Sequence, residues 1–303
     1  MKIAVFGIGG VGGVVGGALA RLHDETYFFA RGENLRAIRE GGLQVESAPL
    51  GNFTVQPKLV SDDAAVIGSV DVLLVTSKGY DMGEVCRTAA PMVAPATVVI
   101  PLLNGVNVPE SMEPHLPPCI LASGLIRIYC HQKKPGLVFH QSGGAIAMGM
   151  RDGGAQPALN ETAALLTEAG IPSAVSGDIL LDVWKKYVNM CGNSTVYCWF
   201  DAPAGAVRQK SGYEGVIRAI VGELVSVAAA KGIRLPADTI DNQVEAFSKA
   251  QPETVTSLYR DLSGGKPAKQ TELAHLVGMC VQMGKETGVS TPYHQAVFDK
   301  YVG

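Results

Sequence analysis

A glycine cluster near the start of the chain constrains the fold more than any other feature. It comprises Gly7-Ile8-Gly9-Gly10-Val11-Gly12, directly after a short apolar run at residues 2–6 and shortly before a run of small and apolar residues at 14–22. The first run has the composition of a strand and the second has the spacing of a helix. The chain therefore opens with a strand, a glycine turn and a helix, as a Rossmann-type unit does.

Strand and helix patterns alternate through the first half of the chain, and a polar helix is expected at residues 33–40. Strand-like segments lie at residues 26–30, 70–76, 98–103, 121–129 and 145–150. Such alternation predicts a parallel sheet. Beyond residue 178 the pattern is mostly helical, at residues 179–200, 213–231, 238–249 and 271–287. We expect an α/β fold, with an N-terminal Rossmann-type doubly wound sheet in residues 1–177 and a mostly α-helical domain in residues 178–303.

Composition limits the kinds of partner. The 303 residues carry a formal net charge of -3 without a run of Lys or Arg, which argues against nucleic acid and anionic membrane surfaces. No apolar stretch reaches the roughly 20 residues of a membrane span. The six cysteines form no CxxC pair and the six histidines lack ligand spacing, so we predict no disulfide framework and no metal site. We expect a cytoplasmic protein that binds a small molecule, with a homodimer as a candidate assembly.

The glycine turn has the spacing of a dinucleotide-binding loop. Gly7, Gly9 and Gly12 occupy the positions where glycine permits the tight bend, the close approach of a pyrophosphate and close packing of helix on strand. Phosphate oxygens would accept hydrogen bonds from backbone N–H groups at the helix start, where the helix dipole also favours negative charge. The turn therefore predicts a bound dinucleotide.

The residue after the second strand discriminates between dinucleotides. An acidic residue there binds the ribose 2′-hydroxyl of NAD, whereas an arginine pairs with the 2′-phosphate of NADP. This chain has Arg31, whose planar guanidinium suits a phosphate. The sequence therefore predicts NADPH as the cofactor, and a solvated surface charge is the alternative interpretation of Arg31.

Two more candidates follow strands at the carboxyl edge of the sheet, where ligands bind in open α/β folds. Lys78 follows the strand at residues 70–76, and Asn104 follows the strand at 98–103. An amide at this edge can bind both a nicotinamide ribose and a substrate oxygen. The alternatives are an ordinary surface lysine and, for Asn104-Gly105, a plain turn pair.

The helical half opens with lysines and amides. Reduction of a ketone by hydride transfer leaves an alkoxide, so the site needs a positioned acid that polarises the carbonyl and delivers a proton. Lys185 and Lys186 lie in residues 182–194 together with Asn189 and Asn193. This segment is the candidate source of the acid.

Taken together, these motifs resemble the ketopantoate reductase (2-dehydropantoate 2-reductase) family. The similarity covers nearly the whole chain through separated motifs in the same order, at residues 2–12, Arg31, 75–78, Asn104-Gly105, 184–186, 257–261, Thr271-Glu272, Gly288-Val289 and Thr291-Pro292. The resemblance implies an N-terminal Rossmann domain and a C-terminal helical domain. It also implies NADPH-dependent reduction of 2-dehydropantoate, a 2-oxo acid, to pantoate in coenzyme A biosynthesis.

The resemblance assigns roles to individual residues. The family's catalytic lysine lies two residues after a tryptophan, which gives Lys186. Its active-site glutamate lies sixteen residues before the glycine of a Gly-Val-x-Thr-Pro segment, which gives Glu272. Ser257 matches the serine that contacts the substrate carboxylate, and Asn104 matches the asparagine at the nicotinamide and substrate. Asn104 and Glu272 are accordingly expected to contribute to the cofactor site as well.

One departure from the family concerns the amides four and eight residues after the lysine. Counted from Lys186, these positions are Met190 and Ser194; counted from Lys185, they are Asn189 and Asn193. One residue turns a helix by about 100°, so the two lysines face different directions.

We take Lys186 as the acid, with Asn193 on its face as a substrate-binding residue, and keep Lys185 as the alternative. The same departure leaves two other functions open. One is an NADP-dependent reductase of another 2-oxo or 3-hydroxy acid, and the other is a non-catalytic NADP-binding regulator.

Overall fold

The computed structural model describes residues 1–77 and 82–302, so the predicted cofactor residue Lys78 lies outside the described residues. The chain divides into two compact units, one of residues 1–103 with 107–179 and the other of residues 104–106 with 180–303. Within the described ranges, no helix is both long enough and apolar enough to cross a membrane.

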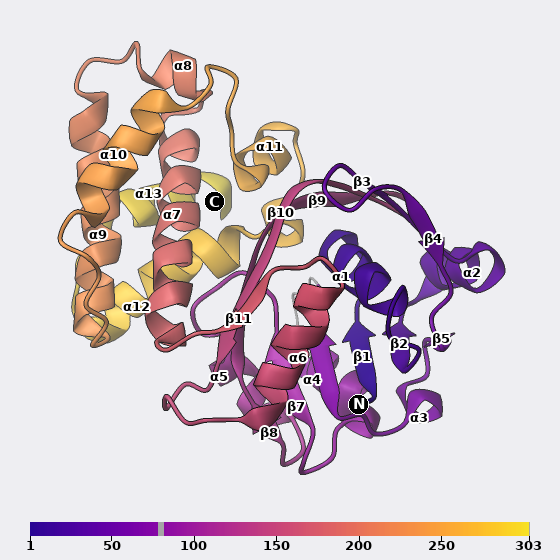
Figure 1. The fold of residues 1–303 in the computed structure, drawn as a ribbon. Helices are drawn as coiled ribbons and strands as arrows, with labels where there is room; N and C mark the ends of the chain where they lie inside the picture. Colours follow the sequence, from indigo (N-terminus) through magenta and orange to yellow (C-terminus); the bar gives the residue numbers. More distant parts are fainter. Residues whose placement is uncertain (78–81, 303) are drawn as a thin grey trace. The chain divides into compact units, whose positions relative to one another are not determined.

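The first unit is built on a parallel sheet of six strands (Figure 1), which confirms the predicted Rossmann-type architecture. The strand order is β5-β2-β1-β6-β7-β8, and every neighbouring pair is parallel. The strands are β1 (Ile3–Phe6), β2 (Thr26–Phe29), β5 (Leu59–Ser61), β6 (Val72–Val75), β7 (Val98–Pro101) and β8 (Ile120–Leu121).

Both faces of this sheet are covered, which explains its continuous apolar strands. Successive side chains of a strand point to opposite faces. In β1, Ile3 and Val5 belong to one core, whereas Ala4 and Phe6 belong to the other. The helices of this unit are α1 (Gly10–Ala20), α2 (Gly32–Gly41), α3 (Ala64–Ile67), α4 (Met82–Ala89), α5 (Val108–Met112) and α6 (Pro157–Glu168).

A second sheet was not predicted from the sequence. Its order is β11-β10-β3-β4, with β9 paired antiparallel to β10. The segments expected at residues 121–129 and 145–150 fall largely in the hairpin of β9 and β10. Register shifts around His140 and Gly143 interrupt the alternation of apolar and polar residues that would have predicted the remainder of this hairpin. The strands are β3 (Leu43–Ser47), β4 (Phe53–Val55), β9 (Ser123–Lys134), β10 (Leu137–Gly149) and β11 (Ser173–Val175).

Helix α1 lies between the two sheets, and its glycines make this possible. A Cβ on Gly13 would lie 2.5 Å from Val138 of β10, and one on Gly16 would lie 2.8 Å from Phe28 of β2. The helix begins at Gly10 and not near residue 14 as expected, because packing on both sides overrides the low helical propensity of glycine.

The second unit is helical, as predicted. Helix α9 packs against α10, α12 and α13, and both α12 and α13 contact the π-helical turn η4. The segment expected as one helix at residues 271–287 is this turn followed by α12. The elements are α7 (Ile179–Phe200), α8 (Ala204–Val207), α9 (Tyr213–Ala230), α10 (Thr239–Lys249), α11 (Ser257–Ser263), η4 (Ala274–Gly278), α12 (Met279–Thr287) and α13 (Pro292–Val302).

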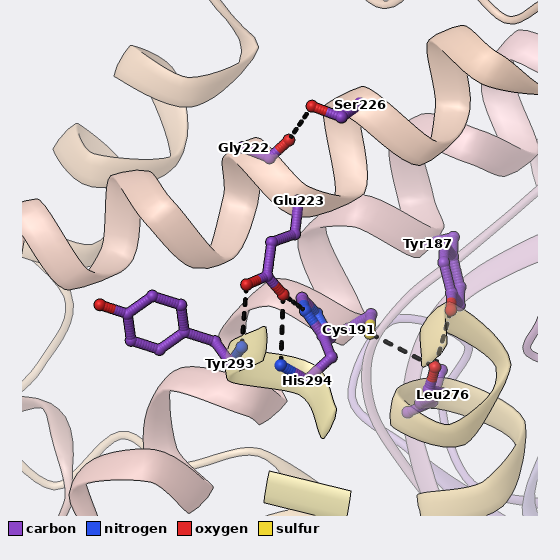
Figure 2. A network of polar contacts seen from close by, with 8 residues as sticks. All are labelled: Tyr187, Cys191, Gly222, Glu223, Ser226, Leu276, Tyr293 and His294. Atoms are coloured by element: carbon purple, nitrogen blue, oxygen red, sulfur yellow. Dashed lines mark hydrogen bonds and ion pairs between the residues drawn. The ribbon is translucent and has the colours of Figure 1, made fainter. Parts of the chain in front are cut away.

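A buried carboxylate anchors the start of α13 (Figure 2). Glu223 of α9 accepts hydrogen bonds from the backbone N–H groups of Tyr293, at 2.8 Å, and His294, at 3.2 Å, and contacts His294 Nδ1 at 2.5 Å. Burial alone lowers the pKa of His294, but its contacts with Cys191, Cys280 and Glu223 outweigh burial and hold this pKa well above 6.5. The carboxylate therefore satisfies N–H groups that a helix start leaves unpaired, and it also holds a buried histidine.

Candidate functional site

The glycine turn between β1 and α1 is shaped by close backbone packing. Gly7 has φ +99°, and a Cβ there would lie 2.7 Å from the backbone of Ser77. A Cβ on Gly12 would lie 2.1 Å from the Gly7 carbonyl oxygen and 2.4 Å from Thr76 Oγ1. Thr76 Oγ1 in turn donates to the Gly7 carbonyl at 2.7 Å. Gly7 therefore permits the bend of the turn, and Gly12 permits the close packing of α1 on the strands.

Gly9 differs from these two residues because the space beside it is open. A Cβ on Gly9 would meet no described atom within 4 Å. Gly9 is also the N-cap of α1, so it has no side chain with which to cap the first N–H groups of the helix. An open approach to backbone N–H groups at a helix N-terminus suits a phosphate group. The turn formed by Gly7, Ile8, Gly9, Gly10, Val11 and Gly12 therefore fits a dinucleotide.

Arg31 lies two residues beyond β2, at the N-cap of α2, and its side chain is about half exposed. Its guanidinium donates to Thr88 Oγ1 at 3.1 Å and lies 3.6 Å from a carboxylate oxygen of Glu84, both on α4. The same group lies over the Phe29 ring. Arg31 is thus available to bind a phosphate, but it already has an acidic neighbour that the sequence did not reveal.

In the second unit, three of the predicted site residues form a hydrogen-bonded group. Lys186 Nζ on α7 donates to Asn104 Oδ1 at 2.8 Å, and Asn104 Nδ2 donates to Glu272 Oε1 at 3.0 Å. Asn104 lies in the segment of residues 104–106, which belongs to this unit although the chain before and after the segment belongs to the first. The side-chain amide of Asn104 therefore bridges Glu272 and Lys186 by one hydrogen bond to each.

The charges of the two outer residues fix the orientation of this amide. An ammonium group can only donate hydrogen bonds, and a carboxylate can only accept them. An amide between them must direct its oxygen to Lys186 and its nitrogen to Glu272, as observed. The Asn104 side chain is therefore held in a single orientation.

The amides on α7 bind a residue that the sequence analysis missed. Asn189 Nδ2 donates to Gln243 Oε1 at 3.2 Å, and Gln243 Nε2 donates to Asn193 Oδ1 at 2.7 Å. Gln243 lies on α10 and is buried. No motif marked Gln243, because a glutamine in an amphipathic helix is ordinary in sequence. Asn193 is thus held by α10 and, within the described part of the chain, is not hydrogen bonded to Asn104.

Two other candidates lie apart from the lysine group. Lys185 is exposed, whereas Lys186 is partly buried and contacts Asn104. Ser257 is exposed at the first residue of α11 and, among the described residues, is not hydrogen bonded to Asn104 or Glu272. The structure therefore joins Lys186, Asn104 and Glu272, but not Ser257.

The sequence as a whole matches known family models. The model described as "Ketopantoate reductase PanE/ApbA" matches residues 3–153, and the model of the C-terminal part of the same proteins matches residues 178–301. The chain belongs to the ketopantoate reductase family. The resemblance seen in the sequence motifs is confirmed, and the chain is an oxidoreductase.

Individual members and neighbours of the ketopantoate reductase family are similar over nearly their full lengths. The 2-dehydropantoate 2-reductase of Caulobacter vibrioides is 29% identical over 98% of this chain and 96% of its own. The crystal structure of 2-dehydropantoate 2-reductase from Porphyromonas gingivalis has a TM-score of 0.84 and 28% identity, covering 100% of this chain and 99% of that one. A D-mandelate dehydrogenase solved with NADH and anilino(oxo)acetate has a TM-score of 0.85 at 22% identity, covering 99% and 96%, and so shares the fold.

Proposed function

We propose that this chain reduces 2-dehydropantoate to pantoate with NADPH, a step toward pantothenate and coenzyme A. The observation that supports this most is the hydrogen-bonded group of Lys186, Asn104 and Glu272. It provides a cation that can polarise a ketone and a fixed amide beside that cation. Relatives named as 2-dehydropantoate 2-reductases share this length and family.

Lys186 is the proposed acid. The reduced nicotinamide supplies hydride to the C2 carbon of the ketone when it is bound. The Lys186 ammonium stabilises the negative charge that develops on the ketone oxygen and donates the proton that forms the hydroxyl. Asn104 and Glu272 hold the ammonium in place through the contacts at 2.8 and 3.0 Å. Ser257 and Asn193 remain proposed contacts for the substrate.

The first unit supplies the proposed cofactor site. The backbone N–H groups at the start of α1 would hold the pyrophosphate, because Gly9 leaves room for it. Arg31 would hold the 2′-phosphate that distinguishes NADPH from NADH. The ion pair with Glu84 weakens this preference, because binding a phosphate places another anion beside that carboxylate.

A second candidate function is the reduction of a different 2-oxo acid. Met190 and Ser194 replace the amides expected four and eight residues after Lys186. The D-mandelate dehydrogenase with the same fold was solved with anilino(oxo)acetate, whose name indicates an aromatic 2-oxo acid analogue. Substrate choice therefore depends on side chains around Lys186 and not on Lys186 itself.

The test is to follow NADPH oxidation with a panel of 2-oxo acids that includes 2-dehydropantoate, benzoylformate, pyruvate and 2-oxoglutarate. We expect the highest kcat/KM with 2-dehydropantoate, at least about 10-fold above the others, which corresponds to about 1.4 kcal/mol of discrimination. A higher value with benzoylformate would support the second candidate. Turnover of none of these acids, with NADPH still bound, would contradict both and support the non-catalytic regulator.

A further inference from the structure

The carbonyl group of Leu276 is turned toward α7 and accepts two side-chain hydrogen bonds (Figure 2). Tyr187 Oη donates to it at 2.7 Å, and Cys191 Sγ donates at 3.4 Å. These donors are four residues apart and so lie on the same face of α7. Both side chains are buried. The contacts therefore tie α7 to one peptide group of the segment that follows Glu272.

This peptide group lies in a π-helical turn. Turn η4 (Ala274–Gly278) is wider than an α-helix, and such turns are often found at functional sites. Leu276 N donates to the Glu272 carbonyl at 2.9 Å, while the Leu276 carbonyl accepts from Tyr187. The main chain of Leu276 is therefore bound to Glu272 through its N–H group and to α7 through its carbonyl group.

These contacts close a ring that contains the proposed active site. Tyr187 binds Leu276, Leu276 binds Glu272, Glu272 binds Asn104, and Asn104 binds Lys186, at distances of 2.7, 2.9, 3.0 and 2.8 Å. Lys186 and Tyr187 are neighbours in sequence and complete the ring through the backbone of α7. The main chain of Glu272 is thus linked to Tyr187 through Leu276. Its side chain is bound by Asn104, which also binds Lys186.

We propose that Tyr187 is a positioning residue that sets the Lys186–Asn104–Glu272 group by binding the Leu276 carbonyl. The inference rests on the proposed function of Lys186. Without the phenol oxygen, the π-helical turn loses its stronger tie to α7, and Glu272 can shift relative to Lys186. Displacements of about 1 Å at a reacting group lower catalytic rates by about 100-fold.

The environment of the phenol suits this role. Burial raises the pKa of Tyr187 well above its usual range, and the neighbouring thiols Cys191 and Cys280 raise it further. The hydroxyl therefore stays protonated and can donate a hydrogen bond. The Trp184 ring packs edge-on against the Tyr187 ring at a centroid distance of 5.8 Å, which restricts its rotation.

The experiment compares Tyr187→Phe with wild type in NADPH-dependent reduction of 2-dehydropantoate. We expect kcat to fall by about 10- to 100-fold, whereas KM and the Kd of NADPH change by less than about 3-fold. Adding Cys191→Ser in the Tyr187→Phe background places a hydroxyl on the same face of α7. This double variant should recover part of kcat, which a purely structural role would not predict.

Two control variants separate positioning from stability. Tyr213→Phe also removes a phenol oxygen in this unit, one that binds Glu214 at the exposed start of α9, and should leave kcat unchanged. Ile220→Val weakens the buried core on α9 and should lower Tm without lowering kcat per folded molecule. If Tyr187→Phe does not fold, Cys191→Ala tests the same carbonyl, with an expected loss of about 2- to 3-fold in kcat.

The outcomes distinguish this inference from the proposed function. If Lys186→Ala abolishes turnover but Tyr187→Phe keeps the wild-type kcat, the positioning role is wrong and the proposed acid stands. If Lys186→Ala itself keeps wild-type turnover, the proposed function of this group fails. The inference would also be overturned if the loss of kcat in Tyr187→Phe equalled the loss of folded protein and the double variant recovered no activity.

Discussion

The glycine turn and the lysine group are built from very different stretches of chain. The turn uses consecutive residues, Gly7 to Gly12, and its shape follows from where side chains are missing. The lysine group joins Asn104 to residues 82 and 168 positions away, and its shape follows from hydrogen bonds between side chains. A site made from one short segment can be recognised locally and disrupted by steric change. A site assembled from distant segments depends on whatever holds those segments.

The largest expected effect is in the lysine group. Lys186→Ala should lower kcat by about 100- to 10,000-fold, the usual contribution of a positioned acid, and leave the Kd of NADPH nearly unchanged. Steady-state kinetics and a fluorescence titration with NADPH measure the two quantities. Lys185→Ala is the matched comparison, because it removes the same charge one residue away at an exposed position. Equal losses in both variants would mean that Lys186 is not the acid.

The next largest expected effect is on the stability of the second unit. Glu223→Gln should lower the free energy of unfolding by about 3 kcal/mol near neutral pH, because a buried imidazolium loses its carboxylate. The pKa of His294 is raised in the folded state, so its contribution is complete below about pH 6.5 and declines as the pH rises through the folded value.

Urea unfolding from about pH 6 to about pH 9 tests this dependence. The difference in unfolding free energy between wild type and Glu223→Gln should shrink as the pH rises. A difference that stays constant over this pH range would show that the histidine is neutral when buried. Arg218→Gln, which removes an exposed partner of Asp241 from α9, is the control and should change stability by less than about 1 kcal/mol.

Two glycines of the turn, Gly9 and Gly12, are expected to respond differently to replacement by alanine. Gly12→Ala forces a Cβ to within 2.1 Å of the Gly7 carbonyl oxygen, so α1 must move away from the strands. We expect a loss of about 1–3 kcal/mol in stability together with weaker NADPH binding. Gly9→Ala has open space for its Cβ and should weaken NADPH binding while leaving Tm nearly unchanged. Normal NADPH affinity in both variants would exclude the turn as the phosphate site.

The smallest expected effects concern cofactor choice. Arg31→Ala should weaken NADPH binding by about 10-fold and leave NADH binding unchanged, because only NADPH has the 2′-phosphate. Glu84→Gln removes the neighbouring carboxylate at 3.6 Å and should tighten NADPH binding by about 2- to 5-fold. Titrations with both dinucleotides measure the ratio, and an unaltered ratio in Arg31→Ala would rule out its phosphate role.

The sequence predicted the parts of the fold that have strong local signals. The buried parallel strands and long helices such as α7 and α9 have continuous or periodic apolar patterns. The second sheet was missed because bulges in β10 interrupt its alternation, and the start of α1 was missed because its glycines are poor helix formers. These elements exist through tertiary packing, which a single sequence does not display.

The candidate site shows the same division. Lys186 and Glu272 were identified from the family resemblance and Asn104 also from its position after a strand, and the structure brings the three into contact. The intervening role of the amide, the pairing of Asn193 with Gln243 and the pairing of Arg31 with Glu84 could not be predicted. Each depends on where two separate helices or loops meet, and no spacing rule in the sequence encodes that.

The position of α1 between two sheets has a consequence for how the first unit can be studied. Glycines occupy five positions of this helix, and each costs about 1 kcal/mol relative to alanine, so α1 has little reason to be helical before both sheets have formed. The proposed phosphate site at its N-terminus then exists only in the assembled unit. A dinucleotide that binds there would report completed folding, and at 100 times its Kd it would stabilise that state by about 2.7 kcal/mol. Cofactor added during refolding would thus select molecules in which the two sheets have closed around the helix.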